Sequence, residues 1–97
     1  MGNYVHRDGD LTTGHDCWPP TVPATFSSDV FANGRGVVRM GDAIVPHTCP
    51  LIPEMHGGVY VESRSVFVNG RPVQIIGSPV DCGDAAAEGS PDVWVGD

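Results

Sequence analysis

The sequence contains no lysine, and leucine occurs only as Leu11 and Leu51. Long helices draw on leucine, lysine, glutamate and alanine, whereas this chain is rich in valine and glycine. All five positive charges are arginine, and they oppose twelve acidic residues for a formal net charge of −7. Such an acidic chain is poorly suited to nucleic-acid phosphates. We therefore expect a fold without long helices and no nucleic-acid partner.

Long apolar runs are also missing. No stretch approaches the ~20 residues that span a bilayer, and Met1–Asp10 lacks the apolar segment of a signal peptide. The 97 residues predict a single domain, residues 1–97. Three cysteines are an odd number, and without a secretion signal they favour metal ligation over a disulfide framework.

The chain repeats itself. The pattern Val-Phe-x-Asn-Gly-Arg occupies residues 30–35 and returns at residues 66–71, and a truncated copy closes the chain at 89–97. Asn-Gly between β-branched and aromatic residues is typical of a hairpin with a type I′ turn. We expect repeats at roughly 9–40, 41–76 and 77–97.

This pattern predicts an all-β fold with two long loops, residues 11–28 and 43–58. The best candidate for a short helix is Asp84–Glu88. Strands are expected at 29–33, 35–40, 59–62, 66–69, 72–76 and 92–95.

Metal-binding side chains recur in the same register. Gly9-Asp10 leads to His15, Gly41-Asp42 leads to His47, and Gly77-Ser78 leads to Cys82. His56 follows in the second loop. Three imidazoles and one thiolate suit a structural Zn²⁺, with iron less expected. The predicted ligands are His15, His47, His56 and Cys82.

A second ligand set is chemically reasonable. His15 and Cys17, like His47 and Cys49, share a His-x-Cys spacing, so Cys17 or Cys49 could replace Cys82 or His56. A third interpretation leaves all these residues without metal. His6 lies outside the register and is expected to be an ordinary surface histidine.

Catalysis is the main functional alternative. Glu54 lies two residues before His56 and could act as the general base of a small zinc-dependent hydrolase. That chemistry needs an open coordination position and a pocket, for which a domain of this size has little room. Trp18 and Trp94 suit either an interface or the core.

The repeats resemble the PAAR-repeat family, the spike-tip proteins of contractile phage tails and type VI secretion systems. The resemblance rests on residues 65–73, the Gly-Asp pairs at 9–10 and 41–42, and residues 89–96. The family's four name-giving residues fall at Pro72-Val73-Gln74-Ile75 and at Gly36-Val37-Val38-Arg39. Neither copy is a literal Pro-Ala-Ala-Arg.

The resemblance implies a small cone of three pseudo-threefold β-hairpin repeats with a metal-stapled vertex. Its base would cap a trimeric β-helical spike, one tip per trimer, and its ligands would be His15, His47, His56 and Cys82. The implied role is structural, a sharpened membrane-piercing point with no enzyme activity and no effector extension. The location would be a virion tail tip, or the cytoplasm followed by type VI export. A zinc-stabilised cargo or adaptor module is the remaining alternative.

Overall fold

The computed structural model describes residues 3–52 and 54–96, so Asp97, the last residue of the predicted third repeat, lies outside it. Three two-stranded antiparallel sheets form, β1–β2, β3–β4 and β5–β6. Within the described ranges there is no helix, hence none long and apolar enough to cross a membrane. The predicted all-β class is confirmed. The strands are β1 (Phe31–Ala32), β2 (Arg35–Gly36), β3 (His47–Thr48), β4 (Met55–His56), β5 (Phe67–Val68) and β6 (Arg71–Pro72).

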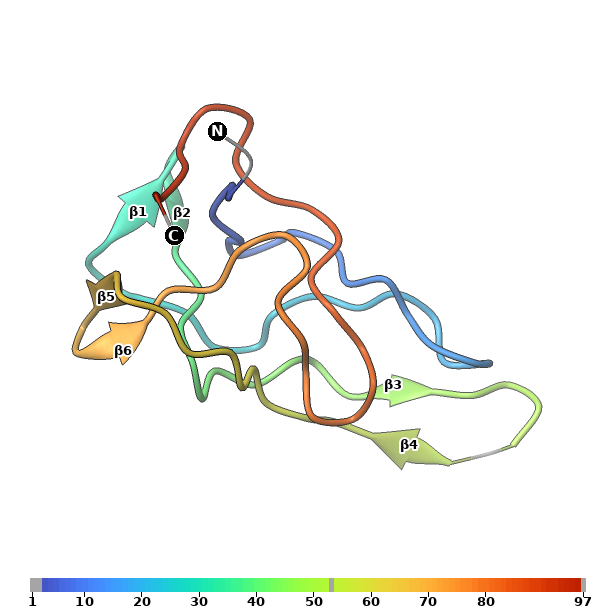
Figure 1. Cartoon of the computed structure of the whole chain (residues 1–97). Helices are drawn as coiled ribbons and strands as arrows, with labels where there is room; N and C mark the ends of the chain where they lie inside the picture. Colours follow the sequence, from blue (N-terminus) through green and yellow to red (C-terminus); the bar gives the residue numbers. More distant parts are fainter. Residues whose placement is uncertain (1–2, 53, 97) are drawn as a thin grey trace.

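The molecule is elongated, with extents of 39 × 23 × 23 Å. Its broad end carries the β1–β2 and β5–β6 hairpins and both ends of the chain, whereas β3 and β4 extend to the narrow end (Figure 1). We call the broad end the base. The narrow end, built from segments 13–19, 45–52, 54–57 and 81–83, is the apex.

The two base hairpins turn at Asn-Gly, as predicted. Asn33 and Gly34 have φ angles of 55° and 77°, and Asn69 and Gly70 have 54° and 75°. Two consecutive positive φ angles define a type I′ turn, which most residues other than asparagine and glycine disfavour.

A third hairpin-like pairing joins segments from opposite parts of the sequence. Trp94 pairs with Tyr4 in an antiparallel bridge, so the first described residues supply the strand that the third repeat lacks. The same backbone hydrogen bond recurs in all three units: Val37 N to Val30 O (3.1 Å), Val73 N to Val66 O (2.9 Å) and Val5 N to Val93 O (3.1 Å).

The three units meet around a closed ring of backbone hydrogen bonds. His6 donates to Gln74 (3.0 Å), Gln74 to Val38 (2.9 Å), and Val38 back to His6 (3.0 Å). All three residues are fully buried. This cyclic arrangement gives the fold its pseudo-threefold axis.

The expectation that His6 is an ordinary surface residue is therefore wrong. Its ring contacts the Tyr60 hydroxyl (Nε2, 2.8 Å) and the Glu88 carbonyl (Nδ1, 2.6 Å). A carbonyl only accepts, so Nδ1 carries the hydrogen and the neutral Nε2 accepts from Tyr60. Burial lowers the pKa of His6, which favours this neutral form.

Apolar burial is confined to the base and the middle of the molecule. One cluster lies beneath the hairpins, and its buried members are Val5, Ala32, Val37 and Val73. The other lies toward the apex and contains Val38, Ile44, Tyr60, Val80 and Ala86. Among the described residues of the apex, Cys49 is the one buried hydrophobic side chain.

Local elements differ from the predictions in two places. Asp84–Glu88 forms no helix, because Ala85 and Ala86 are extended and bridge to Pro79 and Thr12. The strands β3 and β4 lie within the segment predicted to be the loop 43–58. Elsewhere the observed strands are shorter than predicted and consist of two-residue pairs and isolated bridges. The reason is that successive residues of a segment pair with different units.

Candidate metal centre

Two candidate ligands lie on neighbouring strands at the apex. His47 in β3 is the direct antiparallel partner of His56 in β4. Directly opposed residues of an antiparallel pair project their side chains from the same face of the sheet. The pairing therefore brings the two imidazoles together, with Nε2 atoms 2.8 Å apart.

His15 reaches the same point from a tight turn. Its backbone N–H and carbonyl both bond to Trp18, and Asp16 between them has a φ of 51°. Gly14 precedes the turn with a φ of 72°, and a Cβ there would lie 2.8 Å from the Trp18 carbonyl oxygen. Glycine is thus required for the turn that presents His15.

Cys82 completes the group from a third loop. The turn at Val80–Gly83 is closed by a hydrogen bond from Gly83 N to Val80 O (3.1 Å). Gly58 packs beneath it, and a Cβ at that position would lie 2.7 Å from Asp81 and 3.2 Å from the Cys82 sulfur. The absence of a side chain at Gly58 lets this loop approach the histidines.

Four donor atoms converge. The Nε2 atom of His15 lies 3.3 Å from that of His47 and 2.9 Å from that of His56. One ligand atom from each of the three histidines and from Cys82 lies within 4.8 Å of every other. A tetrahedral zinc with ligands at about 2.0–2.3 Å needs donors separated by roughly 3.3 Å or slightly more, so the two shorter nitrogen–nitrogen pairs would separate by about half an ångström around an ion. The four side chains could therefore hold a metal ion.

The tautomer of His47 supports this. Its Nδ1 lies 2.8 Å from the carbonyl oxygen of Pro19, which only accepts, so the hydrogen sits on Nδ1. The Nε2 lone pair is then directed at the other donors, the arrangement that metal-bound histidines usually adopt. A metal ion placed between the donors would accept this lone pair.

The environment of His56 also favours metal binding. Partial burial lowers the pKa of His56, and the adjacent rings of His47 and His15 lower it further. A lower pKa keeps the imidazole neutral near pH 7, as ligation requires.

The other two cysteines are bonded to each other. Cys17 and Cys49 form a disulfide with a Cα–Cα distance of 5.1 Å, and Cys82 is the free cysteine. The expectation that metal ligation replaces disulfides is thus wrong for this pair, and the alternative His-x-Cys ligand set loses both sulfurs. Two repeats place a cysteine two residues after their histidine, and folding brings those cysteines together.

Trp18 is a site residue whose role the sequence left open. Its indole stacks on His15 at a centroid distance of 5.3 Å and lies 4.5 Å from the His56 ring. Its Nε1 donates to the Glu54 carbonyl (3.0 Å). Trp18 covers one side of the histidines. Its position three residues after His15 is the feature of the sequence that could have placed it at the site.

Glu54, the predicted general base of the hydrolase alternative, has an exposed side chain and does not belong to the four-residue group. Its carbonyl, not its carboxylate, contributes to the apex by accepting hydrogen bonds from Trp18 and Cys49. Four protein donors also fill a tetrahedral shell without an open position for water. The geometry gives the hydrolase alternative no support.

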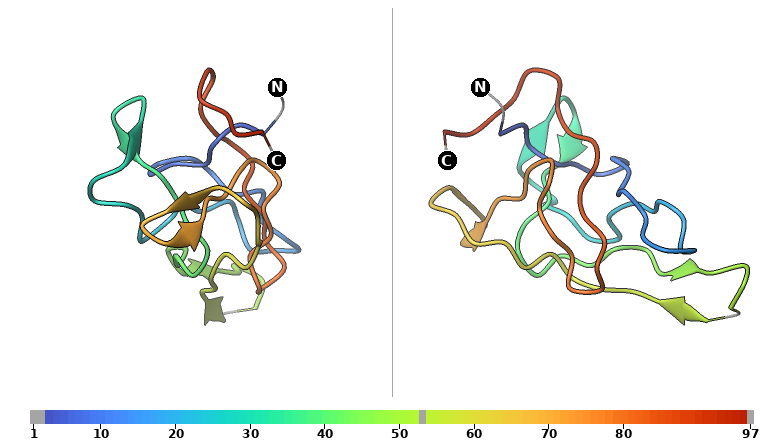
Figure 2. Two further views of the ribbon diagram at one scale, coloured as in Figure 1. Left: turned by 60° about the vertical axis from the view of Figure 1, so that its left-hand side comes forward. Right: turned by 45° about the vertical axis from the view of Figure 1, so that its right-hand side comes forward.

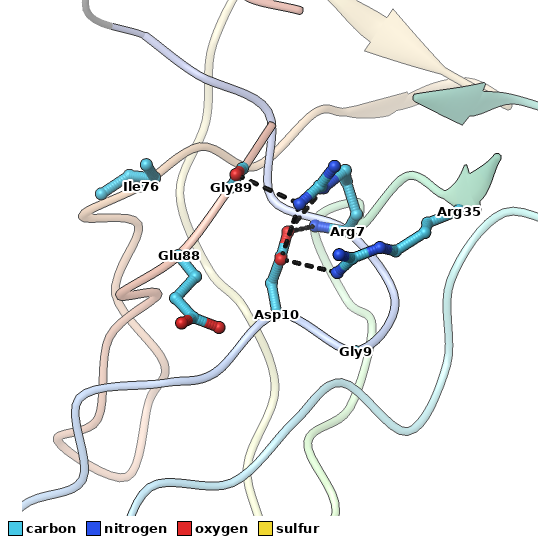
Figure 3. A pocket seen from close by; sticks show the side chains of 7 residues that line it. All are labelled: Arg7, Gly9, Asp10, Arg35, Ile76, Glu88 and Gly89. Carbon is cyan, nitrogen blue, oxygen red and sulfur yellow. Dashed lines mark hydrogen bonds and ion pairs between the residues drawn. The ribbon is translucent and has the colours of Figure 1, made fainter. Parts of the chain in front are cut away.

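A cavity of about 440 Å³ lies away from this centre, in the body of the molecule. Asp10 lies there between Arg7 and Arg35, with nitrogen–oxygen distances of 2.8–2.9 Å (Figure 3). Because both guanidiniums already contact this carboxylate, we interpret the cluster as structural. The remaining lining residues are Gly9, Ile76, Glu88 and Gly89.

Comparison with known proteins adds no identification. No protein-family model matches the chain, and no curated protein is similar to it.

Proposed function

We propose that this protein is a structural tip of the PAAR-repeat type, whose base caps a trimeric β-helical spike and whose apex is a metal-stapled point. The observation that carries the proposal is the closed hydrogen-bond ring of His6, Val38 and Gln74. One chain thereby acquires three equivalent faces, which suit the three chains of a trimer. Its role is mechanical, with no reaction catalysed.

The base carries matching apolar contacts for such a partner. Phe31, Phe67 and Trp94 occupy equivalent positions, each directly after the valine whose carbonyl accepts the repeated hydrogen bond. Their exposed fractions are 58%, 58% and 51%. Large aromatic side chains exposed at threefold positions suit a threefold-symmetric surface, since aromatics contribute strongly to interfaces.

The metal we propose is a single structural Zn²⁺. Three imidazole nitrogens and one thiolate are borderline donors that zinc accepts in tetrahedral geometry, and a full protein shell is typical of a structural site. The apex has almost no apolar burial of its own, so a cross-link is the available means of ordering it.

This proposal keeps the locations that the resemblance implies, a phage tail tip or the exported spike of a type VI system. In either case sheath contraction would drive the point through a target envelope. The cargo or adaptor alternative shares the metal and the fold, and differs in the partner that the base meets.

Binding to a purified trimeric β-helical spike from a contractile tail tests the proposal. Light scattering after gel filtration should give one chain per trimer, and Phe31→Glu, Phe67→Glu and Trp94→Glu should each weaken binding. Leu51→Glu, at the apex, is the matched control and should bind normally. Failure to bind phage-tail and type VI spikes, or weakening by the apex variant alone, would favour the adaptor alternative.

A further inference from the structure

The apex carries an apolar loop that none of the contacts described above explains. The loop joins β3 to β4, and large apolar side chains of the loop and of β4 are exposed to solvent: Leu51 is 83% exposed, Met55 65% and Ile52 50%. The exposed fractions of Leu51 and Met55 exceed those of the base aromatics, and that of Ile52 is slightly below the 51% of Trp94. The loop projects from the narrow end, away from both ends of the chain (Figure 2).

Charge is absent from this part of the sequence. Between Asp42 and Glu54 there is no Asp, Glu, Lys or Arg, although the chain contains seventeen such residues. Protein surfaces normally intersperse charges with apolar groups, and a contiguous exposed apolar feature marks an interaction site.

The ends of the loop are held by several contacts. Cys49 at its start is bonded to Cys17 and donates its N–H to the Glu54 carbonyl (3.2 Å). Trp18 donates to the same carbonyl, and His47 and His56 flank the loop on both strands. These contacts fix both ends of the loop to the rest of the apex.

We infer that this apex loop inserts its apolar side chains into the hydrocarbon of a zwitterionic lipid bilayer. A convex loop needs no matching groove in a lipid phase, because acyl chains reshape around it. A second copy offers no such groove in the cavity described above, which is lined by Arg7, Asp10 and Arg35. The inference rests on the proposed function, since it names what the point meets.

The surrounding charges select the lipid. Asp16 and Glu54 beside the loop are exposed, as is Asp81 next to Cys82. Their carboxylates repel an anionic surface but suit the ammonium groups of phosphatidylcholine. The apex segments contain neither lysine nor arginine, so the attraction of basic residues that most peripheral proteins use is lacking there.

Trp18 provides the reporter, because it contacts Glu54 at the loop. In the Trp94→Phe variant it is the remaining tryptophan. We expect phosphatidylcholine vesicles brominated on the acyl chains to quench its fluorescence at millimolar lipid. Leu51→Glu in the same background should weaken the apparent lipid affinity by roughly tenfold, since it replaces a buried apolar contact with a charge. Added phosphatidylglycerol should also weaken it.

Phe67→Glu, an equally drastic change at the base, is the matched control and should leave the quenching unchanged. Absence of quenching, equal quenching of the Leu51→Glu variant, or stronger binding to anionic vesicles would each overturn the inference. So would a concentration-dependent dimer that Leu51→Glu abolishes. Because spike binding is measured through the base variants, loss of that binding with lipid insertion intact would fault the proposed function instead.

Discussion

The base and the apex are ordered by different kinds of interaction. In the base, short valine-rich segments pack together, and the same hydrogen bonds recur around a threefold axis. In the apex, among the described residues, Cys49 alone is a buried hydrophobic, and the cross-links are a disulfide and a group of four side chains that could hold a metal ion. The molecule narrows toward the apex, so less interior volume is available there for apolar side chains. Cross-links therefore replace hydrophobic burial as the means of holding the chain together.

Charged residues differ between the two regions as well. In the body, two Arg-x-Gly-Asp segments each fold so that the arginine holds the aspartate with two side-chain nitrogens: Arg7 with Asp10, and Arg39 with Asp42. Burial would raise the pKa of Asp42, but the hydrogen bonds from Arg39 outweigh it and lower the pKa. The third unit has Ile75 and Ser78 instead, and Ser78 Oγ accepts from the Ile75 N–H.

Removing the metal should unfold the apex and leave the base folded. Chelation, or Cys82→Ser, should cost on the order of 10 kcal/mol of apparent stability at the site, as for other structural zinc sites. Hydrogen exchange should rise first at His15, His47 and their neighbours, while the His6–Val38–Gln74 ring stays protected. Elemental analysis should find one zinc per chain in the wild type and none in the variant.

Glu54→Gln is the control for that change and should retain both metal and stability. Simultaneous loss of protection in the base and the apex would contradict the division of the molecule into two separately ordered regions.

Removing the buried charge of Arg7 should destabilise the base. Arg7→Ala leaves buried Asp10 with the backbone N–H of residue 7 and the exposed Arg35, and should destabilise the protein by about 3–5 kcal/mol. Arg35→Ala removes a half-exposed arginine from the same carboxylate and should cost less than about 1 kcal/mol. Urea denaturation of the two variants measures the difference. An equal decrease in the free energy of unfolding of the two variants would show that burial does not determine how much these ion pairs contribute to stability.

The disulfide should contribute less than the metal while supporting it. The Cys17→Ser, Cys49→Ser double variant opens a loop of 32 residues and should lose about 2–4 kcal/mol. Because the bond joins the segments that carry His15 and His47, zinc affinity should fall too. Competition with a chromogenic chelator measures this, and unchanged affinity would mean that the metal orders the apex by itself.

Acidification should weaken the base through His6, the smallest of these effects. Burial lowers the pKa of folded His6 below 6.5, whereas the unfolded residue protonates near that value. The unfolded state therefore binds more protons as the pH falls from 7, and the free energy of unfolding declines. Denaturation of the metal-free Cys82→Ser protein at pH 7 and pH 5 measures this. The variant His6→Gln places at position 6 the residue type that occupies the equivalent position 74, and its free energy of unfolding should decline less. If the decline is unchanged, another group causes the pH dependence.

Much of the fold was predictable because it depends on local patterns. Asn33-Gly34 and Asn69-Gly70 fix their turns through backbone preference alone, and the valine content excludes long helices. The group of His15, His47, His56 and Cys82 was predictable because the loops repeat in register. The β3–β4 pairing was not, because its two-residue strands are too short to leave an alternating pattern.

The sequence by itself determined the all-β class, the two base turns and which side chains could gather at the apex. Only the tertiary structure decided that residues 3–5 complete the third unit, that His6 is buried on the axis, and that Cys17 pairs with Cys49. These features join residues far apart in the chain. Turn geometry is a local property of a few residues, whereas closure around an axis depends on all three units at once.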